Sequence, residues 1–280
     1  MEKKVETRYA ASPREVKQMD TQELREEFLI EKLFIDNEVK LVYSHYDRYI
    51  IGGVMPLEKS VVLETVDALK ASYFLERREL GIINVGGKGT VLVDGTSYEL
   101  EHKEALYVGS GNKEVIFSSA SASAPAKFYI NSTPAHKSFP IKKIGINDVE
   151  VAELGSLETS NARTIRKYIV NSVVDVCQLQ MGMTTLEPGS VWNTMPAHVH
   201  DRRMEIYFYI DVPQDQAVCH FMGEPLETRH IWMANEQAVI SPPWSIHSGA
   251  GTCAYSFVWG MAGENLDYSD MDMCKINELR

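Results

Sequence analysis

The chain has 280 residues, of which 44% are hydrophobic, 24% are charged and 9% are aromatic. This is the composition of a globular protein that buries a core, and it excludes an intrinsically disordered chain. The net charge of −11 disfavours contacts with nucleic-acid phosphates, and no apolar run of about 18 residues offers a membrane span.

Two short helices are predicted near the start of the chain. Ser12 precedes Pro13 and Glu15, which is the pattern of a capping residue, a proline in the first turn and an acid at the third helical position. Asp20 and Glu23 repeat the pattern of cap and acid. The sequence up to these caps is polar and lacks the apolar core of a signal peptide, so we expect a cytoplasmic protein.

The cysteine pattern agrees with this location. The four cysteines, Cys177, Cys219, Cys253 and Cys274, lie far apart in the sequence and form no CxxC pair. Thiols stay reduced in the cytoplasm, so we predict buried, unpaired cysteines.

From about residue 37 onward the sequence predicts strands. Short runs rich in valine, isoleucine, tyrosine and phenylalanine alternate with turn residues, and Asp94-Gly95 between two runs is a strong hairpin signal. The runs cover residues 48–51, 80–85, 90–93, 105–108, 115–118, 127–130, 164–169, 177–183, 206–210, 217–222, 228–233, 238–240 and 254–259. Many short strands at even spacing predict an all-β fold, a sandwich or barrel, in place of βαβ units.

The sequence also repeats itself weakly, with a period of about 125–130 residues. The stretch that begins at Tyr73 aligns with the one that begins at His198, and each is followed by a strand, a glycine-containing turn and a second strand. We therefore predict two related β domains. The predicted parts are a helical segment over residues 1–36, a metal-free β domain over 37–131, a linker over 132–158 and a metal-binding β domain over 159–280.

A possible metal site lies in the second copy alone. His198 and His200 are two apart, so in a strand both imidazoles point to the same side. Glu205 can approach from the start of the next strand, and His247 follows a Ser-Pro-Pro turn. Three imidazoles and one carboxylate suit Zn²⁺, Mn²⁺, Fe²⁺ or Ni²⁺. The first copy has Tyr73, Leu75 and Leu80 at the positions of His198, His200 and Glu205.

The motif resembles that of the cupin superfamily, in which HxH and a glutamate are followed by a distant histidine. Trp244 stands where glycine is common in the second motif. A duplicated β-barrel, or jelly-roll-like domain, with one metal-bearing half resembles a bicupin.

Longer segments are similar to the 5-keto-4-deoxyuronate isomerase family. They are residues 74–80, 163–168, 192–196, 202–209, 227–231, 235–242, 244–249 and 259–265. The resemblance implies a homohexameric ketol-isomerase of pectin catabolism that binds one Zn²⁺ per subunit at His198, His200, Glu205 and His247. It implies conversion of 5-dehydro-4-deoxy-D-glucuronate to 3-deoxy-D-glycero-2,5-hexodiulosonate.

An isomerisation of this kind removes hydrogen from a carbon beside a carbonyl. A general base outside the metal ligands can carry the proton, and His230 and Glu236 are the candidates. A metal-promoted hydride shift needs no base and remains an alternative.

The acidic substrate needs a cation, because a guanidinium can bind a carboxylate through two hydrogen bonds. Arg163 is the first candidate. The other candidate substrate-binding residues are Lys167, Arg202, Arg203, Arg229 and, for the sugar hydroxyls, Gln180 and Thr184.

The two arginines beside the metal ligands have counterparts in the first copy. Arg202 and Arg203 align with Arg77 and Arg78, which lie in the copy without metal ligands. This coincidence favours a shared structural role for at least one arginine of each pair.

Two other functions fit the same motif. A cupin dioxygenase would hold iron in the same ligand set and would need O₂. A sugar-binding bicupin would bind a uronate without changing it.

Overall fold

A computed structural model describes residues 5–264 and 266–280 of the chain, which form two compact units. The first unit comprises the described part of Met1–Arg8 together with Lys32–Val149 and Tyr168–Gln180, and the second comprises Tyr9–Glu31, Glu150–Lys167 and Met181–Arg280. No helix in the described part of the chain has the length and apolar character to cross a membrane.

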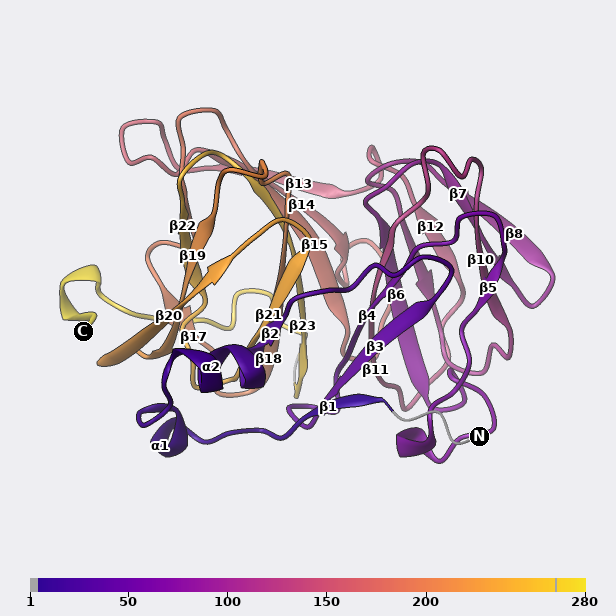
Figure 1. Cartoon of the computed structure of the whole chain (residues 1–280), viewed down its shortest axis with the longest axis horizontal. Coiled ribbons are helices and arrows are strands. Elements are labelled where there is room, and N and C mark those ends of the chain that lie inside the picture. Colours follow the sequence, from indigo (N-terminus) through magenta and orange to yellow (C-terminus); the bar gives the residue numbers. More distant parts are fainter. Residues whose placement is uncertain (1–4, 265) are drawn as a thin grey trace. The chain divides into compact units, whose positions relative to one another are not determined.

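The first unit consists mainly of two β-sheets (Figure 1). The larger sheet has the order β1 (Glu6–Arg8), β3 (Val39–Ser44), β4 (Ile50–Val54), β11 (Phe128–Pro134), β6 (Arg78–Asn84), β9 (Ala105–Val108) and β12 (Lys142–Ile144). The smaller sheet has the order β5 (Val61–Val62), β10 (Val115–Ser119), β7 (Gly89–Val93) and β8 (Thr96–Leu100). A 3-10 helix, η1, covers Asp67–Leu69.

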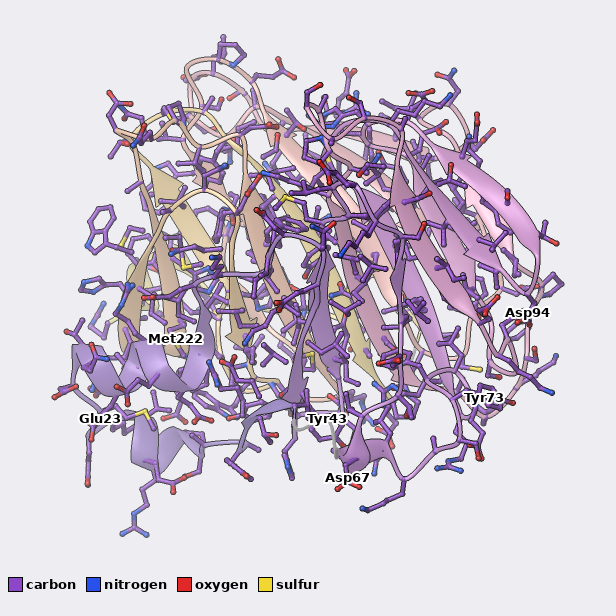
Figure 2. The ribbon with its side chains drawn as sticks, turned by 45° about the vertical axis from the view of Figure 1, so that its right-hand side comes forward. Glu23, Tyr43, Asp67, Tyr73, Asp94 and Met222 are labelled. Atoms are coloured by element: carbon purple, nitrogen blue, oxygen red, sulfur yellow. The ribbon has the colours of Figure 1, made fainter. Side chains whose placement is uncertain are left out.

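The predicted hairpin at Asp94-Gly95 is confirmed. These two residues join β7 to β8, and Val93 pairs with Thr96 across the turn. Both turn residues have positive φ, 44° and 83°, as a tight turn of this hand requires. Asp94 lies at the tip of this hairpin in Figure 2.

The second unit repeats this plan. Its larger sheet has the order β13 (Glu150–Leu154), β14 (Arg163–Ile169), β15 (Gln180–Leu186), β23 (Ser256–Gly263), β18 (Arg203–Ile210), β21 (Gln237–Ser241) and β2 (Leu29–Ile30). A smaller sheet has the order β16 (Trp192–Asn193), β22 (Ser248–Gly251), β19 (Val218–Glu224) and β20 (Glu227–Met233). A third sheet pairs β17 (His198–Val199) with β24 (Asp272–Met273). A 3-10 helix, η2, covers Ile276–Glu278.

The two units share a strand order, which supports the predicted repeat. The series β3-β4-β11-β6-β9 of the first unit matches β14-β15-β23-β18-β21 of the second. β6 and β18 begin at the aligned arginines Arg78 and Arg203. The prediction of an all-β fold is confirmed, and the paired larger and smaller sheets of each unit fit the predicted β-barrel or jelly-roll-like domains.

The two predicted helices are also confirmed. They are α1 (Pro13–Val16) and α2 (Thr21–Phe28), and both start with a complete capping box, Ser12 with Glu15 and Asp20 with Glu23. α2 buries Leu24 and Phe28 and lies beside β20 and β21 (Figure 1).

The interior of the first unit is apolar where the second unit has its histidines. Leu75, Leu80 and Phe74 are all buried in the core of the first unit, together with Val115 and Phe117. Close packing of these side chains leaves no set of ligand atoms at the positions that align with the metal motif.

Candidate metal centre

The four predicted ligands come from neighbouring pieces of the second unit. His198 lies on the short strand β17, His200 follows it, and Glu205 lies on β18. His247 immediately precedes β22. The backbone N–H of His200 donates to the carbonyl of Pro243 over 3.1 Å, which ties the HxH segment to the Ser-Pro-Pro turn.

The side chains of these four residues are buried, between 1% and 8% exposed, and converge. The Nε2 atom of His247 lies 2.9 Å from Nε2 of His198 and 2.9 Å from Oε2 of Glu205. The Nε2 atom of His200 lies 3.7 Å from Oε1 of Glu205. One ligand atom from each of the three imidazoles lies within 4.8 Å of the others. This spacing can hold a single metal ion.

Hydrogen bonds to backbone carbonyls orient two of these rings. The Nδ1–H of His200 donates to the carbonyl of Asp270, and the Nδ1–H of His247 donates to that of Ser245 over 3.3 Å. The Nε2 lone pairs therefore face the centre of the cluster, which is the tautomer that binds metal. Nε2 of His200 is buried and has no hydrogen-bond partner. A cation would satisfy this nitrogen, so the residues fit a metal.

The protonation states also suit a metal. Burial and the neighbouring His247 imidazole lower the pKa of His198 to about 2. Burial alone would raise the pKa of Glu205, but the imidazoles of His247 and His200 outweigh burial and hold that pKa well below its ordinary value. A neutral imidazole, as at His198, and an ionised carboxylate, as at Glu205, are forms that coordinate metals.

Three of the four, His198, His200 and Glu205, line a cavity of about 230 Å³. Its other polar lining residues are Arg163, Thr184, Thr194, Tyr207 and Tyr268, and apolar residues such as Trp259, Met271 and Met273 complete the wall. Arg163 is the one lysine or arginine among the described residues that line the cavity. Its Nη1 donates to the carbonyl of Asn161 over 2.9 Å, and burial lowers the pKa of Arg163 from its ordinary value.

A tyrosine that the sequence analysis did not single out lies next to the ligands. The hydroxyl of Tyr207 lies 2.7 Å from Oγ1 of Thr194, and both residues line the cavity. Burial, followed by the Glu205 carboxylate, raises the pKa of Tyr207 well above its ordinary value, so the phenol stays protonated. The sequence does carry a signal for it, because Tyr207 is two residues after Glu205 in a strand and faces the same side.

The structure does not bring the two candidate bases to this cavity. His230 is exposed on β20, where Ile231 and Met233 turn inward and the alternation turns His230 outward. Glu236 lies in the turn between β20 and β21 with a φ of 60°, and its N–H donates to the carbonyl of Tyr209. Neither residue lines the cavity.

The remaining candidates for substrate binding also lie outside the lining, except Thr184. Lys167 binds Glu150 over 2.5 Å and lies 4.4 Å from the ring centre of Tyr268. Exposed Arg202 pairs with Glu264 over 2.9 Å.

Arg229 and Gln180 lie outside the cavity lining as well. Arg229 pairs with Glu227 over 3.0 Å and donates to the carbonyl of Lys17 over 2.7 Å. Gln180 is buried at the start of β15, in a part of the chain assigned to the first unit.

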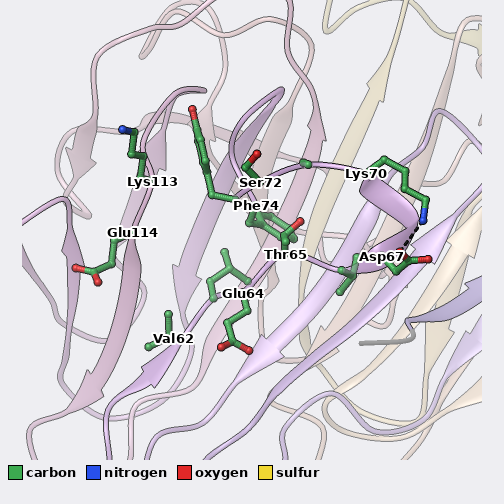
Figure 3. A pocket seen from close by; sticks show the side chains of 13 residues that line it. Val62, Glu64, Thr65, Asp67, Lys70, Ser72, Phe74, Lys113 and Glu114 are labelled. Atoms are coloured by element: carbon green, nitrogen blue, oxygen red, sulfur yellow. Dashed lines mark hydrogen bonds and ion pairs between the residues drawn. The ribbon is translucent and has the colours of Figure 1, made fainter. Parts of the chain in front are cut away.

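The first unit has a larger hollow with different chemistry (Figure 3). Its volume is about 660 Å³, and its lining includes Tyr73, Glu64 and Glu114. An ion pair of 2.6 Å joins Asp67 and Lys70 at its rim. No histidine or cysteine occurs among its described lining residues, so it offers no counterpart of the imidazole cluster.

Comparison with known proteins identifies close relatives. The pattern of the KduI/IolB family matches residues 28–276. The 4-deoxy-L-threo-5-hexosulose-uronate ketol-isomerase of Formosa agariphila is 66% identical over 280 residues, with 100% of both chains covered. The protein named 4-deoxy-L-threo-5-hexosulose-uronate ketol-isomerase 1 of Bacteroides thetaiotaomicron is 57% identical over the same length, again covering 100% of both chains.

Solved structures show the same fold at low identity. An IolB-like protein from Salmonella typhimurium has a TM-score of 0.71 at 14% identity, covering 90% of this chain and 97% of its own. Oxalate decarboxylase from Bacillus subtilis, studied for its Mn(II) centres, has a TM-score of 0.55 at 12% identity, covering 80% and 71%. These likenesses agree with the cupin-like fold expected from the sequence.

Proposed function

The chain belongs to the KduI/IolB family, and we propose that it is a metal-dependent ketol-isomerase acting on 4-deoxy-L-threo-5-hexosulose uronate. The curated relatives above carry that substrate and reaction in their names at 57% and 66% identity over the full chain. The reaction moves the substrate carbonyl from C1 to C2 and gives 3-deoxy-D-glycero-2,5-hexodiulosonate.

The observation that carries this proposal is that His198 and His200 of the imidazole cluster line one cavity together with the Arg163 guanidinium. A bound metal supplies a Lewis acid for the carbonyl and hydroxyl oxygens of the substrate. Arg163 binds the C6 carboxylate, for which a guanidinium is the best protein partner. The cavity volume of about 230 Å³ is below the roughly 300–1,000 Å³ of sites for drug-sized ligands, as suits a six-carbon acid.

The Tyr207–Thr194 pair handles the hydroxyl proton. As the carbonyl moves, the proton on O2 must reach O1. The protonated phenol of Tyr207 donates one proton while Thr194 passes on another, and their 2.7 Å hydrogen bond provides the connection. The same phenol stabilises negative charge that develops on the substrate oxygens.

The carbon-bound hydrogen has no separate base in the cavity. Glu205 is the one carboxylate among the described lining residues, and it belongs to the ligand cluster. This favours direct transfer in the substrate, in which hydrogen leaves C2 with its electron pair and bonds to C1. The O2 proton then neutralises O1, so the carbonyl ends at C2 and atoms and charge balance.

Product analysis by NMR in D₂O tests both parts of the proposal. We expect the metal-loaded protein to convert the deoxy-ketouronate to the 2,5-diulosonate without O₂, and to introduce no solvent deuterium at C1. Deuterium at C1 would indicate that a base transfers the proton, and it would refute direct transfer. Binding of the uronate without a shift of its carbonyl would refute the isomerase, and a requirement for O₂ would favour the dioxygenase.

The identity of the metal, the assembly, the location and the pathway expected from the sequence are part of the same proposal. Imidazole and carboxylate ligands suit Zn²⁺, with one ion per subunit, although manganese and iron accept the same set. We also propose a homohexamer that works in the cytoplasm in pectin catabolism, on the strength of the family resemblance. Elemental analysis of the purified protein and its mass in solution test the metal and the assembly.

A further inference from the structure

A C-terminal segment, residues 266–274, closes one side of the metal cavity. We call it the strap. Three of its residues, Tyr268, Met271 and Met273, line the cavity. Its strand β24 pairs with the ligand strand β17, with His198 opposite Met273. The N–H of Cys274 donates to the carbonyl of Ala197 over 2.9 Å.

One guanidinium holds the strap in place. Arg203 is 1% exposed. Its Nη1 donates to the carbonyl of Asp267 over 2.7 Å, and its Nη2 donates to the carbonyls of Tyr268 and Asp270 over 3.1 Å each. The planar fork of arginine can serve three carbonyls at once, whereas an ammonium is a single point charge.

The same contacts reach a metal ligand. The carbonyl of Asp270 accepts from Nη2 of Arg203 and from Nδ1–H of His200. Such outer partners fix the ring orientation and tautomer of a ligating histidine. On the basis of the isomerase function proposed above, we propose that Arg203 is a positioning residue. It fixes the strap as a wall of the substrate cavity and, through the Asp270 carbonyl, holds His200 in its metal-binding form.

The matching arginine of the first unit, Arg78, makes no such link to a described residue, so the contact between a guanidinium and a histidine-binding carbonyl is particular to the second unit. Arg78 is also buried, but its Nε donates to Oγ of Ser132, and its Nη2 donates to the carbonyls of Ser132 and Arg48. All of these partners lie in the first unit. Burial is therefore common to the two arginines, whereas a link to an imidazole ligand belongs to Arg203.

Two variants of the full chain separate positioning from stability. Arg203→Lys keeps the charge and loses the fork, and Arg78→Lys makes the same change at the matching position. We measure the Zn²⁺ dissociation constant by chelator competition, then KM and kcat, each well below the melting temperature. For Arg203→Lys we expect Zn²⁺ binding to weaken about 10- to 100-fold and KM to rise more than kcat falls. For Arg78→Lys we expect a lower Tm and unchanged metal affinity and kinetics.

The outcomes are distinct. Wild-type metal affinity and KM in Arg203→Lys would reduce Arg203 to a structural residue and overturn the inference. Should Arg203→Lys not fold, hydrogen exchange on the wild-type protein decides: Zn²⁺ should slow exchange of the Cys274 amide, and no effect would overturn the link. A wild-type protein that binds Zn²⁺ but does not isomerise would refute the proposed function, while weakened Zn²⁺ binding in Arg203→Lys would still support the positioning role.

Discussion

Replacing Arg163 by methionine tests the binding of the substrate carboxylate. The change removes the one guanidinium or ammonium group among the described residues that line the metal cavity, and it keeps a long apolar stem. A hydrogen bond to a charged group contributes about 1.5–3 kcal/mol, and about 1.4 kcal/mol corresponds to a factor of ten in binding. We therefore expect KM to rise about 10- to 150-fold and kcat to change little, because the carboxylate is remote from the reacting carbons.

A neighbour on the same strand provides the control. Arg166 is three residues from Arg163 on β14 and does not line the cavity. Arg166→Met removes the same charge, so an equal rise in KM would indicate a long-range effect of net charge. A substrate analogue with a neutral amide at C6 provides the second arm, since its KM should respond much less to Arg163→Met. An unchanged KM for the acid would remove Arg163 from the substrate site.

Three further predictions concern the metal, the phenol and stability. His247→Ala removes one of four ligands, so bound metal measured by elemental analysis and activity should fall together; full metal content would exclude His247 as a ligand. Tyr207→Phe keeps the ring but loses the proton-carrying hydroxyl, so kcat should fall at least about 100-fold with metal content unchanged; a wild-type kcat would assign the proton path elsewhere. Burial raises the pKa of Tyr129 and of Tyr255 above the ordinary value. The folded state therefore favours their neutral form, and this contribution is complete below the unfolded pKa of about 10 and is lost as the pH rises above it. Denaturant titrations from pH 8 to about 11 should show the free energy of unfolding falling more steeply above about pH 10.

The convergence of the candidate metal ligands was predictable because its signal is local. His198 and His200 are two apart on a strand, so their common direction follows from backbone geometry alone. The other two candidate ligands are Glu205, at the start of the strand that follows the HxH segment, and His247, after the Ser-Pro-Pro turn. The Asp94-Gly95 hairpin was predictable for the same reason, since two adjacent residues determine that turn.

The position of His230, Glu236 and most candidate substrate residues outside the cavity lining was not predictable, because residue type does not show which face of a strand is buried. His230 has suitable chemistry, but the pattern of β20 turns Ile231 and Met233 inward and leaves His230 exposed. Tyr207 was missed for a different reason. It is two residues after Glu205, so the two side chains face the same side of the strand, but a tyrosine in an apolar run is usually interpreted as part of the core. Arg163 lies in the cavity as expected, although its distance along the chain from the ligands gave no local signal.

The comparison of the two units explains why chemistry resides in one of them. At aligned positions the first unit buries Leu75 and Leu80, and burial of one leucine side chain contributes about 1.5–3 kcal/mol. The second unit gives up this contribution at His200 and Glu205, and an unpaired buried carboxylate would cost several kcal/mol. The imidazoles around Glu205, 2.9 Å and 3.7 Å away, offset that cost only in part, because Nε2 of His200 still lacks a partner. The buried leucines of the first unit need no cover, whereas the strap covers one side of the polar cluster of the second unit, and Arg203 donates to carbonyls of that strap. The first unit thus gains stability from apolar side chains at the aligned positions, while the second unit keeps converging candidate ligand atoms for which apolar packing would leave no room.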